Sequence, residues 1–267
     1  MSIFDYGTLL CPKPIKLSIG TLRKPKLNEI YDITFERFYF FEVLLKLTPE
    51  TYYTSLMGDD GEQKWNSFGD DEKKDMTLYS LILNDERLQQ LYTEMFGFFF
   101  IEDIVFRSPY FVILNNGISD DHELTKEDVH GVISENTFST VLLMIQQICC
   151  IYEKEAEEEV EPKFKNALAK KMYEKMKKAK KEQERTKRGN KDLAIPNIIS
   201  KVSNKHLSIN PINVWDMTLF QLIDSFNCLR VNSIYDINST RVAVWGDEKK
   251  TFDMSQWYKA NEDNNDI

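Results

Sequence analysis

Apolar residues recur at helical spacing along most of the chain, and the clearest row lies between Phe138 and Tyr152. Its members stand three or four residues apart, as side chains do on one face of an α-helix. They are Phe138, Val141, Leu142, Ile145, Ile148, Cys149 and Tyr152. The same spacing predicts a helix over 34–47 and further helices from about residue 72. In the latter stretch Leu88, Tyr92 and Phe96 lie on one apolar face, and Asn84 is the expected cap.

Local capping signals add detail to this helical pattern. Thr48 followed by Pro49 is typical of an N-cap and first turn, so we expect a helix over 48–57. The polar sequence 58–71 that follows predicts a loop.

Two stretches have the composition of β-strands. Residues 16–27 contain Gly20 and Pro25 and predict one or two short strands. Residues 104–114 are rich in β-branched and aromatic side chains, and the sequence Asn-Asn-Gly follows them. This pattern predicts a hairpin arm that ends in a turn at 115–117.

The C-terminal part is entirely helical in pattern. Pro196 can start a helix through Val202, and residues 210–213 have turn composition. Thr218 and Gln221 have the spacing of a capping box ahead of an apolar row that ends at Leu229. A further helix is predicted over 233–245, with Gly246 as the residue that terminates it.

Composition agrees with a folded, mainly α protein that carries a small β element in its N-terminal part. The chain has 267 residues, of which 42% are hydrophobic and 12% aromatic, so it can bury a substantial core. Its 10 Gly and 8 Pro are too few for a many-turn β-sandwich. We expect an N-terminal module over 1–160, a charged helical arm over 161–192, a helical C-terminal module over 193–260, and a disordered tail over 261–267.

Charge is distributed unevenly around the arm. Six glutamates lie between Glu153 and Glu161, whereas residues 163–191 carry thirteen Lys and Arg against three Glu, a net charge of +10. The whole chain carries −9, so the remainder is strongly acidic. Such asymmetry is typical of a protein that docks onto a partner, and it points to no catalytic chemistry.

No motif of an enzyme or cofactor-binding protein occurs. The sequence lacks GxSxG, Walker, GxGxxG and HExxH patterns, so we expect no catalytic residues, no cofactor and no enzymatic activity. The four cysteines form no CxxC pair, which leaves no metal site and favours free thiols in a reducing compartment. No apolar run is long enough to span a membrane, and no secretory signal is recognisable at the N-terminus.

The arm and the tryptophans are the candidate partner-binding residues. Phe164, Leu168, Met172 and Met176 recur every four residues, with Lys171 and Lys175 among the lysines around them. Three interpretations stay open: a solvated helix paired with the nearby glutamates, a helix that docks onto a protein, and a phosphate-binding segment. Trp215 and Trp245 are explained either by core packing or by an aromatic partner groove.

A family resemblance narrows these alternatives. The segments 197–226, 231–246 and 252–259, together with the opening 18–30, resemble in order and aromatic placement small helical proteins of the tail-gene clusters of tailed bacteriophages. The resemblance implies a tail assembly chaperone that binds the long, helical tape measure protein before the tail tube forms. It also implies location in the bacterial host cytoplasm and absence from the mature virion. A homo-oligomer is compatible with it, and the alternatives are a nucleic-acid-binding phage protein and a structural tail component.

Overall fold

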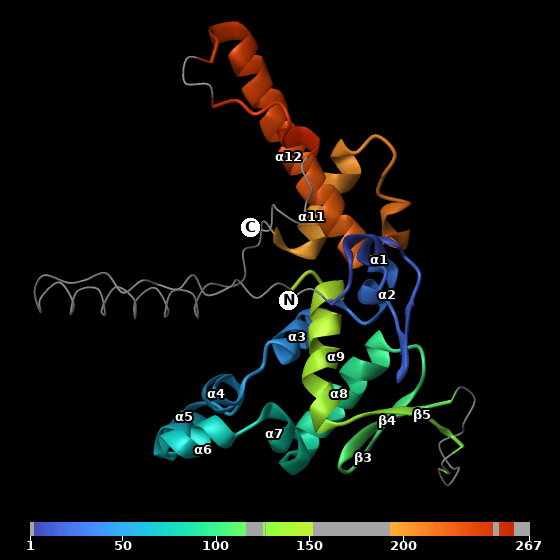
Figure 1. Ribbon diagram of the computed structural model, residues 1–267, viewed down its shortest axis with the longest axis vertical. Coiled ribbons are helices and arrows are strands. Elements are labelled where there is room, and N and C mark those ends of the chain that lie inside the picture. The colour runs from blue at the N-terminus through green and yellow to red at the C-terminus, as the bar shows by residue number, and fades with distance from the viewer. Residues whose placement is uncertain (1–2, 116–124, 126, 152–192, 248–250, 259–267) are drawn as a thin grey trace, which may run out of the picture. The chain divides into compact units, whose positions relative to one another are not determined.

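The computed structural model describes residues 3–115, 125, 127–151, 193–247 and 251–258, and it is mainly helical with two small antiparallel sheets (Figure 1). The chain divides into two compact units. The first, the core unit, comprises Met1–Ile151 together with Trp215–Gln221. The second, the C-terminal unit, comprises Tyr152–Val214 and Leu222–Ile267. The chain therefore returns to the core unit for seven residues before it continues.

The core unit contains mostly short helices, two helices of 14 residues and both sheets. Its elements are α1 (Tyr6–Leu10), β1 (Ile15–Leu17), β2 (Gly20–Leu22), α2 (Leu27–Asp32), α3 (Phe35–Leu45), α4 (Pro49–Thr51), a π-helical turn (Tyr52–Leu56), α5 (Asp59–Ser67), α6 (Asp70–Asp75), α7 (Leu78–Asn84), α8 (Glu86–Phe99), β3 (Ile104–Arg107), β4 (Tyr110–Leu114), β5 (Val129–Ile133) and α9 (Glu135–Ile148). The expected helices over 34–47 and 48–57 are present, with Thr34 and Thr48 as their N-caps.

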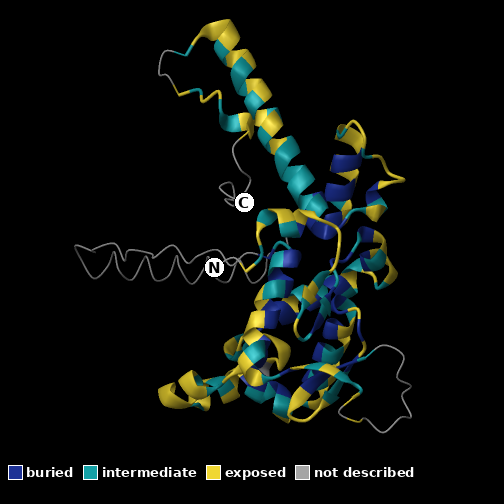
Figure 2. Ribbon diagram, turned by 45° about the vertical axis from the view of Figure 1, so that its right-hand side comes forward, coloured by how far each residue is buried: buried dark blue, intermediate teal, exposed yellow. Residues whose placement is uncertain are grey.

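Aromatic side chains from distant parts of the sequence form the centre of this unit. Tyr92 and Phe96 on α8 pack against Phe138 on α9, with ring centroids 5.5 and 6.1 Å apart respectively. Phe96 also meets Phe111 of β4 edge-on at 5.1 Å. The buried Tyr92 hydroxyl donates a hydrogen bond of 2.8 Å to the carbonyl of Leu44 in α3. The amphipathic rows predicted from the sequence are therefore the rows that build this core (Figure 2).

Residues 104–114 form β-structure, as predicted, but they contain both strands of a hairpin and not a single arm. Two strands occupy this range, and the chain reverses at the cis peptide bond between Ser108 and Pro109. β5, which the sequence pattern did not indicate, pairs antiparallel with β4 to complete a sheet of order β3-β4-β5. β5 was missed because it is short and contains a glycine, Gly131, and a histidine.

The expected loop over 58–71 is wrong, because α5 occupies most of it, whereas α6 begins at Asp70, close to residue 72 where helices were expected to resume. Polar composition concealed one local hydrogen bond and one contact between different elements. The Glu72 carboxylate accepts a hydrogen bond of 2.8 Å from the Gly69 amide at the start of α6. Trp65 on α5 stacks on Tyr53 with ring centroids 5.8 Å apart, which anchors a mostly polar helix. Asp85, and not Asn84, caps α8 by accepting from the Arg87 amide.

The helix predicted through Tyr152 ends earlier, at Ile148. Cys149 and Cys150 follow α9, and Cys150 has a positive φ of 56°. Burial raises the pKa of the Cys149 thiol well above its ordinary value, so this cysteine is a neutral core residue.

The segment Trp215–Gln221 is fastened to the core unit by backbone and side-chain contacts. The Leu27 amide donates to the Met217 carbonyl at 3.0 Å, and the Leu219 amide donates to the Pro25 carbonyl at 3.1 Å. The predicted capping box is confirmed, because Thr218 and Gln221 exchange hydrogen bonds of 3.0 and 3.2 Å. Thr218 is only 1% exposed, so this helix start is part of the core.

The C-terminal unit contains α11 (Ile195–Lys205), the part of α12 (Leu219–Trp245) from Leu222 onward, and a 3-10 turn at Gln256–Tyr258. Pro196 stands in the first turn of α11, as expected. The two helices predicted over 218–229 and 233–245 are a single helix, because no Gly or Pro interrupts the sequence between them. Lys205 of α11 hydrogen-bonds the Ser233 hydroxyl of α12.

Candidate partner-binding surface

Candidate metal ligands do not cluster in the part of the chain that the structure describes. Across 3–115, 125, 127–151, 193–247 and 251–258, no three His, Cys, Asp or Glu residues gather closely enough to hold a metal ion. None of the described helices combines the length and the apolar character that crossing a membrane requires. Several apolar side chains that the fold leaves exposed form the candidate functional surface.

The end of α12 is shaped by a glycine and an aspartate. Gly246 has φ of +75°, and its amide donates to the Val242 carbonyl at 2.8 Å, which closes the helix as the sequence predicted. The Asp247 carboxylate then accepts hydrogen bonds from the amides of Phe252 (2.8 Å) and Thr251 (3.1 Å). These two backbone bonds lower the pKa of Asp247. They fix the start of a return segment, defined here as Thr251–Tyr258.

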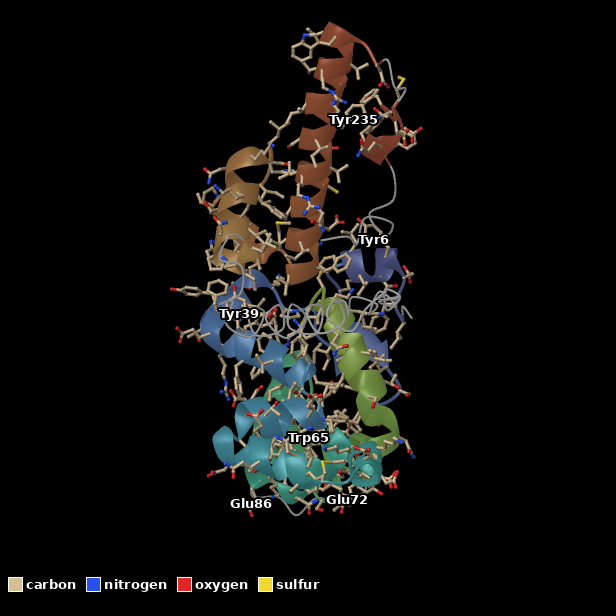
Figure 3. All side chains as sticks on the ribbon, turned by 90° about the vertical axis from the view of Figure 1, so that its left-hand side faces the viewer. Tyr6, Tyr39, Trp65, Glu72, Glu86 and Tyr235 are labelled. Carbon is tan, nitrogen blue, oxygen red and sulfur yellow. The ribbon has the colours of Figure 1, made fainter. Side chains whose placement is uncertain are left out.

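The return segment packs on one side of α12. The ring of Phe252 lies 5.5 Å from that of Tyr235, the residue labelled on α12 in Figure 3. A shallow pocket of about 310 Å³ lies on the same side and is lined by Asn232, Tyr235, Asp236 and Trp257. The pocket is open to solvent, and its walls carry one carboxylate and no cluster of catalytic groups.

A different side of α12 carries an exposed apolar row, which we name the distal stripe: Ile234, Ile237, Val244 and Trp245. Because an α-helix turns about 100° per residue, these four positions fall within an arc of roughly 100° that excludes Tyr235. Ile237 is 69% exposed and Trp245 is 77% exposed. In Figure 2 the end of α12 near Trp245 shows no buried residue. The return segment therefore does not cover this row.

The spacing of the stripe is that of a coiled-coil seam. Ile234, Ile237, Arg241 and Val244 alternate at intervals of three and four residues, the a and d positions of a heptad. Trp245 flanks the last of them. Arg241 places one charge within an otherwise apolar row, a feature that selects among partner helices at a cost in stability. The stripe is suited to receive another amphipathic helix.

The predicted partner-binding residues fall in three places. Phe164, Leu168, Lys171, Met172, Lys175 and Met176 lie outside the described residues. Trp215 belongs to the core unit, where its ring meets that of Tyr31 edge-on at 5.7 Å. Trp245 lies in the C-terminal unit at the end of α12. The two tryptophans are thus parts of separate surfaces.

Sequence reasoning missed Ile234, Ile237 and Val244 as exposed residues. The three-and-four spacing was visible in the helix predicted over 233–245, but spacing alone gives no sign of which face is covered. What distinguishes the stripe is the return segment, which occupies the opposite side through Tyr235 and Phe252.

Comparison with known families places this surface in context. Residues 179–262 match the family model of the YomV second domain. The match indicates a phage-derived domain family for this part of the chain. It contains the whole of α11, α12 and the return segment, and hence the distal stripe. Neither the curated proteins nor the solved structures contain a match to the chain.

Proposed function

We propose that the protein is a non-enzymatic tail assembly chaperone of a tailed bacteriophage. In this proposal it binds the helical tape measure protein in the host cytoplasm, keeps it soluble during assembly, and is absent from the finished virion. The phage-type domain match supports the phage setting. The order of segments shared with tail-cluster proteins supports the role in tail assembly.

The observation that carries the proposal is the distal stripe. Ile237 and Val244 expose most of their side chains to solvent at positions that a coiled-coil partner would cover. Tape measure proteins are long and helical, so they present apolar rows of the same period. Burying such rows on both molecules contributes roughly 25 cal/mol per Å² of apolar surface and keeps the partner from self-association.

The test is co-expression of the full chain with the tape-measure-like protein encoded near it, followed by pull-down. Wild-type protein is expected to hold the partner in the soluble fraction. Ile237→Asp combined with Val244→Asp places two charges in the seam and is expected to abolish capture. The matched control is Leu207→Asp with Ile212→Asp, which alters two fully exposed apolar residues of the same unit outside the stripe. The control is expected to capture the partner normally.

Two results contradict the proposal. The first is a partner that is equally soluble without this protein. The second is equal loss of capture in the stripe variant and in the control, which would mean that apolar exposure in general, and not the seam, retains the partner.

The basic segment 163–191 supports a second candidate function, nucleic-acid binding. Salt separates the two functions. Phosphate binding through six to ten contacts loses about 10³–10⁵ in affinity between roughly 50 and 200 mM salt. Apolar docking survives this range, because salt screens only the charged contacts. Detection of the protein in purified particles would instead identify a structural tail component.

A further inference from the structure

The core unit carries a second apolar row on its surface, separate from the distal stripe. Tyr31 of α2 and Phe35, Tyr39 and Val43 of α3 follow one another every four residues, and we name this row the aromatic ridge. Tyr31 is 62% exposed and Val43 is 51% exposed, while the two residues between them are half-buried. Tyr39 is labelled on α3 in Figure 3.

The ridge is ordered by contacts within the core unit. The Tyr31 ring lies 6.4 Å from that of Phe35, which joins α2 to α3 across the positive φ of Thr34 (73°). Tyr31 also meets Trp215 edge-on. Trp215 thereby braces the ridge, and the aromatic groups are held in place before any partner arrives.

The shape of the ridge fits a helix. A row of side chains at four-residue spacing packs into the groove between two such rows of another helix, and the axes then cross at about 50°. Phe38, Phe41 and Leu44 bury the opposite face of α3 in the core, so α3 is a rigid support for this contact.

The charges beside the ridge select the kind of helix. Asp32 and Glu36 directly follow the ridge residues Tyr31 and Phe35 in sequence, and Asp216 directly follows Trp215. All three are exposed, and no ion pair within the described part of the chain engages them. The nearby Arg37 is neutralised by Glu94, whose carboxylate accepts from the Arg37 Nε at 2.7 Å. Lys46 is the basic side chain at the far end of α3. The border of the ridge is therefore net acidic.

We infer that the aromatic ridge docks a basic amphipathic helix of the partner protein, with apolar residues every four positions and lysines on both sides of them. The inference rests on the proposed function only in taking the partner to be helical. It assigns to the core unit a charge-selective contact that complements the coiled-coil contact of the distal stripe.

Two synthetic peptides test this with the full-length protein. Both carry leucine every fourth residue in the same helical design, and their remaining positions are lysine in one and glutamate in the other. Fluorescence anisotropy is expected to show at least about tenfold tighter binding of the lysine peptide, because like charges across an interface oppose association. Equal binding of both peptides, or binding of neither, overturns the inference.

Matched variants locate the binding site. Tyr31→Asn with Val43→Asn is expected to weaken binding of the lysine peptide about tenfold, since central apolar anchors dominate such contacts. Ile101→Asn with Tyr110→Asn removes two exposed apolar side chains elsewhere on the core unit and is expected to leave binding unchanged. Asp32→Lys with Glu36→Lys is expected to reverse the preference toward the glutamate peptide. Equal effects of the first two pairs would overturn the assignment.

Other occupants of the ridge give distinct results. If light scattering shows a dimer that Tyr31→Asn with Val43→Asn dissociates, the ridge is a contact between copies of the chain and the inference is wrong. It is also wrong if Leu168→Asp with Met172→Asp strengthens peptide binding, because the chain's own basic segment would then be the occupant. Failure of the partner pull-down with retained peptide selectivity would reject the proposed function and leave the ridge assignment standing.

Discussion

The fold partly removes the carboxyl group of Glu42 from water. It lies on α3 next to the core, and burial raises its pKa, although the positive charge of Lys46 one turn away acts in the opposite direction. The folded state therefore binds a proton at Glu42 more readily than the unfolded state does. For a carboxyl group with a raised pKa, the associated stability is present at low pH and is lost as pH rises through the ordinary value of 4.5 and beyond.

Glu42→Gln removes this pH dependence while keeping the shape of the side chain. We expect the variant to have a larger free energy of unfolding than wild type at pH 7 and to lose that advantage below pH 4.5. Urea unfolding at several pH values measures the difference. Glu36→Gln, an exposed position on the same helix, is the control and is expected to change stability by less than about 0.5 kcal/mol. A Glu42→Gln advantage that is constant with pH would contradict this explanation.

The side chain of Thr218 caps the start of α12 within the core unit. Its hydroxyl accepts from the Gln221 amide at 3.2 Å. Thr218→Ala removes that acceptor and is expected to cost about 1 kcal/mol of unfolding free energy. Thr218→Ser keeps the hydroxyl and is expected to recover most of the loss in the same denaturant experiment. Equal stability of the alanine and serine variants would show that the methyl group, and not the cap, matters here.

At the scale of elements, the surroundings of two glycines predict opposite effects of their replacement by alanine. A Cβ on Gly131 of β5 would lie 2.4 Å from the carbonyl oxygen of Ile19, a backbone atom that cannot move aside cheaply. On Gly97 of α8 it would meet nothing within 4 Å. Gly131→Ala is therefore expected to destabilise by about 1–3 kcal/mol or more, through overpacking.

Gly97→Ala is expected to stabilise by roughly 0.5–1 kcal/mol, because alanine has the higher helix propensity. Thermal unfolding of both variants tests the pair. Similar destabilisation by both substitutions would mean that Gly97 has a role that the free space around it does not explain. A neutral Gly131→Ala would mean that β5 can shift away from the segment before β2.

The elements that sequence reasoning found share one property, which is a local signal strong enough to act alone. The row on α9, the Thr48-Pro49 start and the Thr218 capping box are read from neighbouring residues, and all three are present. α5 was missed because a tertiary contact, the stacking of Trp65 on Tyr53, anchors this mostly polar helix. The turn at Ser108 and Pro109 was missed because the strands around it read as one apolar run.

The candidate surfaces were less accessible to such reasoning. Which side of α12 stays exposed depends on where the return segment packs, and that contact joins Tyr235 to Phe252 across a reversal of the chain. The aromatic ridge depends on Tyr31 and Trp215, which are far apart in sequence and adjacent in space. Exposure is a property of the whole fold, so hydrophobic spacing predicts the helix and leaves its function open.

At the scale of the whole molecule, the boundary of the matched domain and the boundary of the compact units do not coincide. The family match covers 179–262 without interruption, yet Trp215–Gln221 belongs to the core unit. In this segment Leu219 and Phe220 are buried, and the Phe220 ring meets that of Tyr6 at 6.0 Å. The side-chain Nε2 of Gln221 donates a hydrogen bond of 3.0 Å to the Leu10 carbonyl. Two parts of the sequence are thereby interleaved in one core.

This interleaving predicts that the core unit is incomplete without the segment. A chain ending at Asn213 and a chain ending at Gln221 differ by eight residues, of which seven belong to the core unit. The longer chain is expected to melt at a higher temperature, by roughly 2–4 °C for each kcal/mol that the segment contributes. Thermal unfolding followed by circular dichroism measures the two melting temperatures. Phe220→Ser in the longer chain is expected to remove much of the increase in melting temperature. Identical midpoints for the two truncated chains would mean that the core unit folds on residues 1–151 alone. In that case the hydrogen bonds that join Leu27 to Met217 and Leu219 to Pro25 would form after the core has folded and would not stabilise it.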